Sequence, residues 1–335
     1  AMMNTKPELI DQAVLYMKIY ALGMPAMAVY NFGNGVLSAR GDTKRPLIYL
    51  SIAGVINVLL NLFFVIVCGM AEDGVALASI ITQYVSAGLI LIHMGRQEND
   101  CTFRFRDLKK GLDKFEGKHI LGLGIPAGLQ NAVFAVANLF IQGAVNSFDS
   151  VMVEGNSAAA NADAIIYNVM AAFYTACATF MGQNLGAKKQ ERVLKSYFIG
   201  ITYSFVAGAV FGGALFLFGR EFLSLFANDE AVIEAGLQRT RIMCFSYAVS
   251  AFMDCTIAAC RGIGKSLAPT VIVIMGSCVF RVAWIYTVFA CFRTIPSLYL
   301  LYIFSWTITA IAEIICFTIY YKKLKMKQDI SVCPS

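Results

Sequence analysis

Long apolar segments alternate with short polar ones along the whole chain. A helix that crosses a bilayer needs about 20 mostly apolar residues. Nine segments meet this requirement, at 13–38, 46–68, 74–95, 119–147, 157–182, 194–218, 240–260, 267–291 and 297–321. The pattern therefore predicts about nine transmembrane helices.

Two of these segments, 119–147 and 157–182, also carry rows of polar side chains. The first row is Asn131, Asn138, Gln142 and Asn146, and the second is Asn161, Asn168, Thr175 and Thr179, with Asp163, Tyr167 and Tyr174 on a neighbouring face. Steps of four and seven keep each row on one helical face. Because hydrocarbon offers no hydrogen-bond partners, the rows should face protein or water. Two interpretations stay open: the rows line a wet cavity, or they join helices by hydrogen bonds.

Composition agrees with an all-α integral membrane protein. Hydrophobic residues make up 58% of the 335 residues and charged residues 14%, and the mean hydropathy is +0.66. A soluble domain has about 25% charged residues. The net charge of +6 forms no continuous basic surface, so no nucleic-acid partner is expected. The ten cysteines are scattered without a CxxC pair, which predicts buried apolar thiols and no resident metal or cofactor.

No catalytic motif interrupts this pattern. The chain lacks GxSxG, HExxH and a nucleotide-binding loop, which argues against an enzyme and against direct coupling to ATP.

The connections between the predicted helices form two alternating sets, one for each side of the membrane. The set that includes the C-terminal end holds 20 Lys and Arg residues, and the other set holds 4. The positive-inside rule then predicts a multi-pass protein with a cytoplasmic C-terminus. Nine helices would place Ala1 outside, which suggests that an odd number of helices precedes it.

A weak internal repeat divides the chain. A helix, a short basic turn with Gly and Pro, and two more helices occur at 13–95 and again at 240–321. Such repeats are typical of transporters with two related lobes and a substrate site between them. The pattern predicts a partial N-terminal lobe at 1–95, a cytoplasmic interlobe loop at 96–118, a six-helix lobe at 119–321 and a cytoplasmic tail at 322–335. Three helices would be missing from the first lobe.

Several motifs then resemble those of one family of secondary transporters. They are LGMPAMAVYNFGNGVLSARGDTKRP, GVALASIITQYVSAGL, LGLGIPAGLQ, MGQNLGAKKQERV and GKSLAPTVIVIMGSCVFRVAWIYTVF. In these motifs the chain resembles the multidrug and toxic compound extrusion (MATE) family, bacterial type. Members of that family have twelve helices, and this chain resembles helices four to twelve. The resemblance implies two pseudo-symmetric lobes, the first incomplete. It also implies a monomer in a bacterial plasma membrane, in contact with lipids. Its activity would be exchange of H+ or Na+ for amphipathic, often cationic, organic compounds by alternating access.

Charged residues within the apolar segments are the candidates for cation coupling, since a charge there is costly. They are Asp254, Asp163 and Glu313. Asp254 could take a proton or a transient Na+, or instead form a structural pair with Arg281, which is interpreted as a counter-ion. Asp163 could also be a gate or a substrate contact. Some relatives add a carboxylate on the helix where this chain has Gln130 and Gln142, a departure that weighs against a two-carboxylate Na+ site.

A wider set of polar and aromatic side chains is predicted to line the substrate cavity. It comprises Gln130, Asn131, Asn138, Gln142, Asn168, Tyr167, Tyr174, Asn57 and Asn61. The tyrosines could stack on a flat organic cation. The family often has an acid at the position of Asn61, so a cation role there is not expected. Two alternatives to drug efflux remain: a lipid-linked oligosaccharide flippase of the same superfamily, or a truncated fragment that transports nothing.

Overall fold

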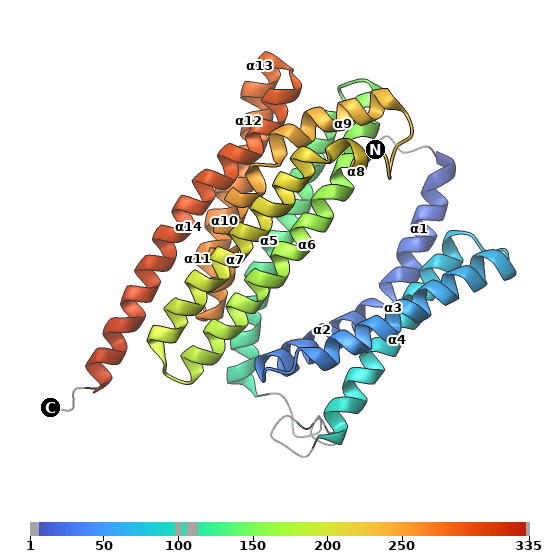
Figure 1. Ribbon diagram of the computed structural model, residues 1–335. Helices are drawn as coiled ribbons and strands as arrows, with labels where there is room; N and C mark the ends of the chain where they lie inside the picture. The colour runs from blue at the N-terminus through green and yellow to red at the C-terminus, as the bar shows by residue number, and fades with distance from the viewer. Residues whose placement is uncertain (1–6, 98–101, 103, 105–112, 333–335) are drawn as a thin grey trace. The chain divides into compact units, whose positions relative to one another are not determined.

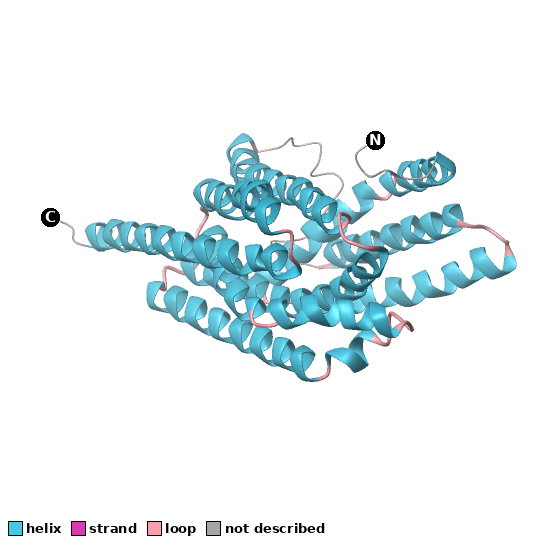
Figure 2. Ribbon diagram, turned by 90° about the horizontal axis from the view of Figure 1, so that it is seen from above, coloured by secondary structure: helices cyan, strands magenta, loops and turns pink. Residues whose placement is uncertain are grey.

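Helices account for all the regular structure in the part of the chain that is described. The computed structural model describes residues 7–97, 102, 104 and 113–332, and no strand occurs among them (Figure 2). The chain divides into two compact units, residues 1–113 and residues 114–335, and each is described by itself. Most of the basic connection predicted at 96–118, including Arg106, Lys109 and Lys110, lies outside the described residues.

The first unit consists of four helices arranged around the last of them (Figure 1). They are α1 (Pro7–Ala21), α2 (Met24–Ala39), α3 (Lys44–Leu62), which continues as the π-helical turn η1 (Phe63–Val67), and α4 (Glu72–Arg96). Helix α4 packs against α1, α2 and α3. Gly33 of α2 lets Ile90 approach closely, since a Cβ there would lie 3.1 Å from the Ile90 side chain. The Tyr30 hydroxyl donates to the carbonyl of Pro46 at 2.9 Å, which ties α2 to α3.

The predicted span 13–38 is not one helix. It divides into α1 and α2, which are separated by Leu22 and Gly23. Pro25 fits the break, because it lies in the first turn of α2, where its missing N–H would have no partner within the helix in any case. Neither half is long enough to span a bilayer alone.

The second unit is a bundle with α10 near its centre. Its elements are α5 (Lys114–Val145), α6 (Ser150–Gly186), α7 (Gln190–Leu217), α8 (Gly219–Leu223), α9 (Glu230–Met243), α10 (Ser246–Gly262), α11 (Leu267–Val273), η3 (Ile274–Val279), α12 (Phe280–Trp284), η4 (Ile285–Phe289), α13 (Ala290–Phe292) and α14 (Ile295–Val332). Helix α10 packs against α6, α7 and α14. Ser246, Ser250 and Thr256 on it are fully buried. Polar residues of α10 are therefore held inside the bundle.

The number of spans differs from the prediction. Seven helices in the described part are long and apolar enough to cross a membrane, and α9 with α10 forms an eighth only if the pair counts as one span bent by 53°. The prediction of nine was wrong because 13–38 is broken. The predicted span 240–260 starts in the last turn of α9, which turns into α10 at Cys244 and Phe245. The predicted tail 322–335 begins inside α14, which stays helical to Val332.

Two π-helical turns, η3 and η4, interrupt the segment 267–292. Such turns inside α-helices are frequent at functional sites. At Gly276 in η3 a Cβ would lie 2.4 Å from Oγ1 of Thr309 on α14, so the two segments meet closely there. The neighbouring Ser277 and Thr309 hydroxyls are 3.1 Å apart. This contact sets the register of the helix that carries Arg281 against α14.

Candidate functional site

Asp254 lies in the middle of α10, inside the second unit. It is partly buried, and no hydrogen bond or ion pair to its carboxylate is found among the described residues. The charges of Arg281 and Arg261 act on it, and its own charge acts on Tyr167 and Tyr174 of α6. The carboxylate is thus not neutralised by direct contact with a described side chain. This is an arrangement that can attract a cation.

Arg281 does not form the predicted pair with Asp254. The guanidinium is buried, and Nε donates to Oγ of Ser305 at 3.0 Å. Its Cζ lies 4.6 Å from the ring centroid of Tyr302 and 5.5 Å from that of Trp306. Nη2 has no hydrogen-bond partner in the described part of the chain. Aromatic faces, which attract cations, surround Arg281 where a carboxylate was expected.

Asp163 is occupied by a network of its own. Arg239 of α9 forms an ion pair with it, and the Tyr247 hydroxyl donates to its other oxygen. Arg239 also donates to the carbonyl of Asn156 at 3.4 Å and lies over the ring of Tyr299. A carboxylate with these partners ties α6 to α9 and α10. This geometry favours a structural role over the coupling, gate or substrate roles predicted for it.

Arg239 was missed by sequence reasoning, which assigned it to a polar connection. It is only 5% exposed. Its position on α9 follows from Asp229, whose side chain caps the helix N-terminus by accepting from the main-chain N–H of Ala231 at 2.9 Å. The capping residue was the available signal that a helix begins there.

Arg261 is a second residue that sequence reasoning left in a loop. Helix α10 continues to Gly262, so Arg261 lies seven residues after Asp254 on the same face. Its Nη2 donates to Oε1 of Gln130 at 2.9 Å, and Thr270 donates to the same oxygen at 3.4 Å. Gln130, predicted to line a cavity, is buried and joins α5 to α10 and α11.

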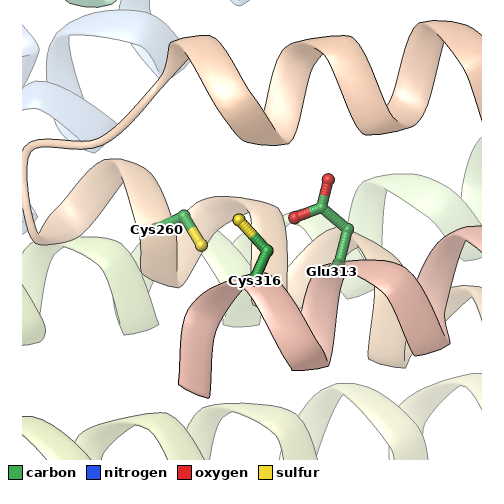
Figure 3. A group of neighbouring side chains, drawn as sticks. All are labelled: Cys260, Glu313 and Cys316. Carbon is green, nitrogen blue, oxygen red and sulfur yellow. The ribbon is translucent and has the colours of Figure 1, made fainter. Parts of the chain in front are cut away.

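Glu313 is fully buried on α14, and both of its carboxylate oxygens lack a hydrogen-bond partner among the described residues. The charge of Arg261 acts on it. Cys260 and Cys316 are its neighbours (Figure 3). The sequence showed these cysteines only as scattered residues, and the structure brings two of them together beside a carboxylate.

The remaining predicted amides divide into two groups. On the surface of the second unit Asn131, Asn138 and Asn168 are exposed, and Gln142 is partly buried and donates to Asn146 at 2.8 Å. In the first unit the predicted amides, Asn57 and Asn61, instead take part in hydrogen bonds between side chains.

Within the first unit Asn57 and Asn61 are partly buried. Asn57 donates to Oγ1 of Thr82 on α4 at 3.3 Å, and Asn61 donates to Oδ1 of Asn57 at 3.0 Å. Oδ1 of Asn61 has no partner among the described residues. Asn57 joins α3 to α4 and Asn61 supports it from the same helix, which favours the interpretation of helix-to-helix hydrogen bonds at this place.

A separate apolar groove of about 350 Å³ lies between α5 and the segment 267–292. It is lined by Val133, Val136, Ala137, Phe140, Cys278, Val279, Val282 and Ala283. None of the predicted polar candidates lines it, so it offers apolar contact without charge recognition.

Comparison with known proteins gives one consistent result. A sequence model of the MatE family matches residues 1–63 and 126–287. The chain is 28% identical over 246 residues to the probable multidrug resistance protein YpnP of Bacillus subtilis. The matched region covers 73% of this chain and 54% of that protein. It is 24% identical over 281 residues to the probable multidrug resistance protein NorM of Thermotoga maritima, covering 80% of this chain and 58% of that protein.

The fold also matches a solved structure. An outward-facing multidrug resistance MATE family transporter superposes with a TM-score of 0.88 at 20% identity, covering 96% of this chain and 72% of that one. The chain spans a little over half the length of the two curated relatives named above.

Proposed function

The chain belongs to the MatE family, and on this basis we propose that it forms part of a secondary transporter that exports amphipathic, often cationic, organic compounds. The coupling ion is H+ or Na+, taken up in exchange for the exported compound. Relatives described as multidrug resistance proteins support the class of substrate. The prediction that the chain is not an enzyme agrees with membership of a transporter family.

Asp254 is the observation that carries this proposal. Its carboxylate has no direct partner among the described side chains, while Asp163 is paired with Arg239. A positive charge about 4 Å from a carboxylate gains roughly 4 kcal/mol at an effective dielectric constant of about 20, before desolvation is subtracted. An organic cation and the coupling ion would both be attracted to Asp254.

Competition for one carboxylate supplies the coupling. When Asp254 binds a proton or Na+, the charge that attracts an organic cation is neutralised, so the two ligands exclude each other. Each ligand then favours release of the other, as reciprocal coupling requires. Tyr167 and Tyr174 are near enough to feel the charge of Asp254 and would contact the flat part of the compound.

The exposed amides extend this site. Asn131, Asn138 and Asn168 lie on the surface of the second unit, where contact with lipid tails would leave them without partners. We assign this surface to a water-filled substrate pathway, with Gln142 at its edge. The remaining features of the proposal are a monomer in a bacterial plasma membrane and a cytoplasmic C-terminus, supported by the bias of Lys and Arg among the connections.

A flippase for lipid-linked pyrophosphate compounds receives less support. Such a substrate needs several cations together. Among the described residues the buried ones are Arg239 and Arg281, and Asp163 neutralises the first while aromatic rings enclose the second.

The test is dye efflux with a charge-neutral substitution. The full-length gene and this 335-residue chain are expressed separately in a drug-sensitive host, and ethidium efflux is followed with imposed Na+ and proton gradients. Asp254→Asn should abolish the gradient dependence while the protein reaches the membrane in normal amount. Glu234→Gln, which changes an exposed carboxylate on α9, is the matched control and should retain coupling.

Two results would overturn the proposal. Absence of gradient-dependent efflux of any cationic dye by the full-length protein would exclude the activity. Intact coupling in Asp254→Asn would exclude this residue while leaving the efflux itself established. Efflux by the 335-residue chain alone would exclude the inert-fragment alternative.

A further inference from the structure

Three potential metal ligands converge between α10 and α14. The Sγ atoms of Cys260 and Cys316 and a carboxylate oxygen of Glu313 all lie within 4.8 Å of one another. Glu313 and Cys316 are three residues apart on α14 and so share a helical face, and this face meets Cys260 on α10. Figure 3 shows the three side chains pointing toward one another.

Glu313 gives an independent indication that a ligand belongs here. The residue is fully buried, and neither carboxylate oxygen has a hydrogen-bond partner in the part of the chain that the structure describes. A buried polar group without a partner is destabilising, and more so if it is charged. Cys260 beside it is also fully buried. A cation held by the carboxylate and the two sulfurs would remove this cost.

The donor atoms narrow the kind of cation. Thiolates favour soft or borderline metals such as Zn²⁺, whereas Mg²⁺ and Ca²⁺ prefer ligand sets made of oxygen. Two thiolates and one carboxylate carry three negative charges. A divalent ion and the positive charge of Arg261, which acts on both Glu313 and Cys260, bring the sum to zero. Charge balance inside the bundle therefore favours a divalent ion.

We propose that Cys260, Glu313 and Cys316 form a three-ligand site for a borderline divalent d-block ion of the Zn²⁺ type. Each thiol releases its proton to solvent when the metal binds, and the fourth coordination position is left for water. Bound metal would link α10 to α14. The site goes beyond the transport proposed above and does not depend on it, because transport was assigned to Asp254.

A disulfide is a poorer explanation of the same cluster. Both cysteines are free thiols. Joining their sulfur atoms would leave the carboxylate of Glu313 as unpartnered as before, whereas metal binding satisfies all three groups.

The first experiment uses the unchanged chain, purified in detergent, freed of metal by chelation and kept reduced. Titration with Cd²⁺, a spectroscopic substitute for Zn²⁺, should produce an ultraviolet thiolate-to-metal charge-transfer band that saturates at one ion per chain. X-ray absorption on the Zn²⁺-loaded chain should show two sulfur neighbours at about 2.3 Å and oxygen neighbours at about 2.0–2.2 Å. Absence of the band, or a shell without two sulfurs, overturns the proposal.

Variants then identify the ligands. Cys260→Ser and Cys316→Ser should each weaken Cd²⁺ binding by more than the ~10–100-fold that loss of an outer-shell partner costs, and Glu313→Gln should weaken it while preserving the charge-transfer band. Cys278→Ser changes a cysteine that is equally buried but outside the cluster, so it should bind Cd²⁺ like the unchanged chain. Unaltered affinity in Cys260→Ser or Cys316→Ser overturns the assignment. The X-ray absorption result decides the matter if a variant fails to fold.

Discussion

Asp163→Asn tests whether the buried ion pair holds α6 to α9. The side chains of Asp163 and Arg239 are only 15% and 7% exposed, so little solvent screens the pair. Removing one partner from a buried pair costs about 3–5 kcal/mol, because the other charge is left without compensation. The asparagine oxygen can still accept from Tyr247, and Arg239 keeps its place over Tyr299. We therefore expect the lower end of that range, about 3 kcal/mol.

A second ion pair that involves α9, between Arg220 of α8 and Glu230 of α9, supplies the matched control. Arg220 and Glu230 are 55% and 67% exposed, and exposed pairs contribute about 0–1 kcal/mol. Equilibrium unfolding of the purified chain in mixed micelles with increasing sodium dodecyl sulfate measures both changes. Glu230→Gln should lower the free energy of unfolding by less than about 1 kcal/mol. Equal losses for Asp163→Asn and Glu230→Gln would refute the argument from burial.

Three further substitutions probe close contacts in the same unfolding assay. Gly155→Ala should lower the free energy of unfolding by about 1–3 kcal/mol, because its Cβ would lie 2.7 Å from main-chain atoms of α9. Gly143 has open space around it, so the control Gly143→Ala should be neutral or stabilising. Gln130→Leu should lower the free energy of unfolding by about 1.5–3 kcal/mol, because it removes the hydrogen-bond acceptor for Arg261. A loss below about 0.5 kcal/mol would mean that water takes the place of the glutamine oxygen. Arg281→Met should be neutral or stabilising, since no carboxylate among the described residues pairs with this buried cation. Strong destabilisation would show that the aromatic enclosure stabilises the charge.

Local patterns in the chain predicted most of its helices. The span 297–321 lies within α14, and 194–218 matches α7 to within one residue of its end, because a long apolar segment in a membrane satisfies its main-chain groups only as a helix. Errors occurred at ends and breaks. The prediction of one span at 13–38 ran through Pro25 in its middle, because whether a proline bends or ends a helix depends on what packs beside it. Helix α9 was missed because its exposed acidic and basic residues resemble a polar connection.

The candidate site was predicted one residue at a time and not as a set of contacts. Helical spacing identified Asp254, Asp163 and Glu313 as charges inside apolar segments. It could not assign partners to them, because a periodic pattern gives the face of a residue and not the helix opposite. Arg239, the partner of Asp163, is 76 residues away in the sequence.

The sequence by itself determined the class of the protein: an all-α membrane chain with charged and amide-bearing faces, since hydrophobicity and helical period are local properties. Tertiary structure alone decided which polar groups are neutralised and which are not. It paired Asp163, left Asp254 without a direct partner, and brought Glu313 to two cysteines. The physical reason is that the energy of a buried charge depends on the atoms within a few ångströms of it, and those atoms come from helices that the packing of the bundle selects.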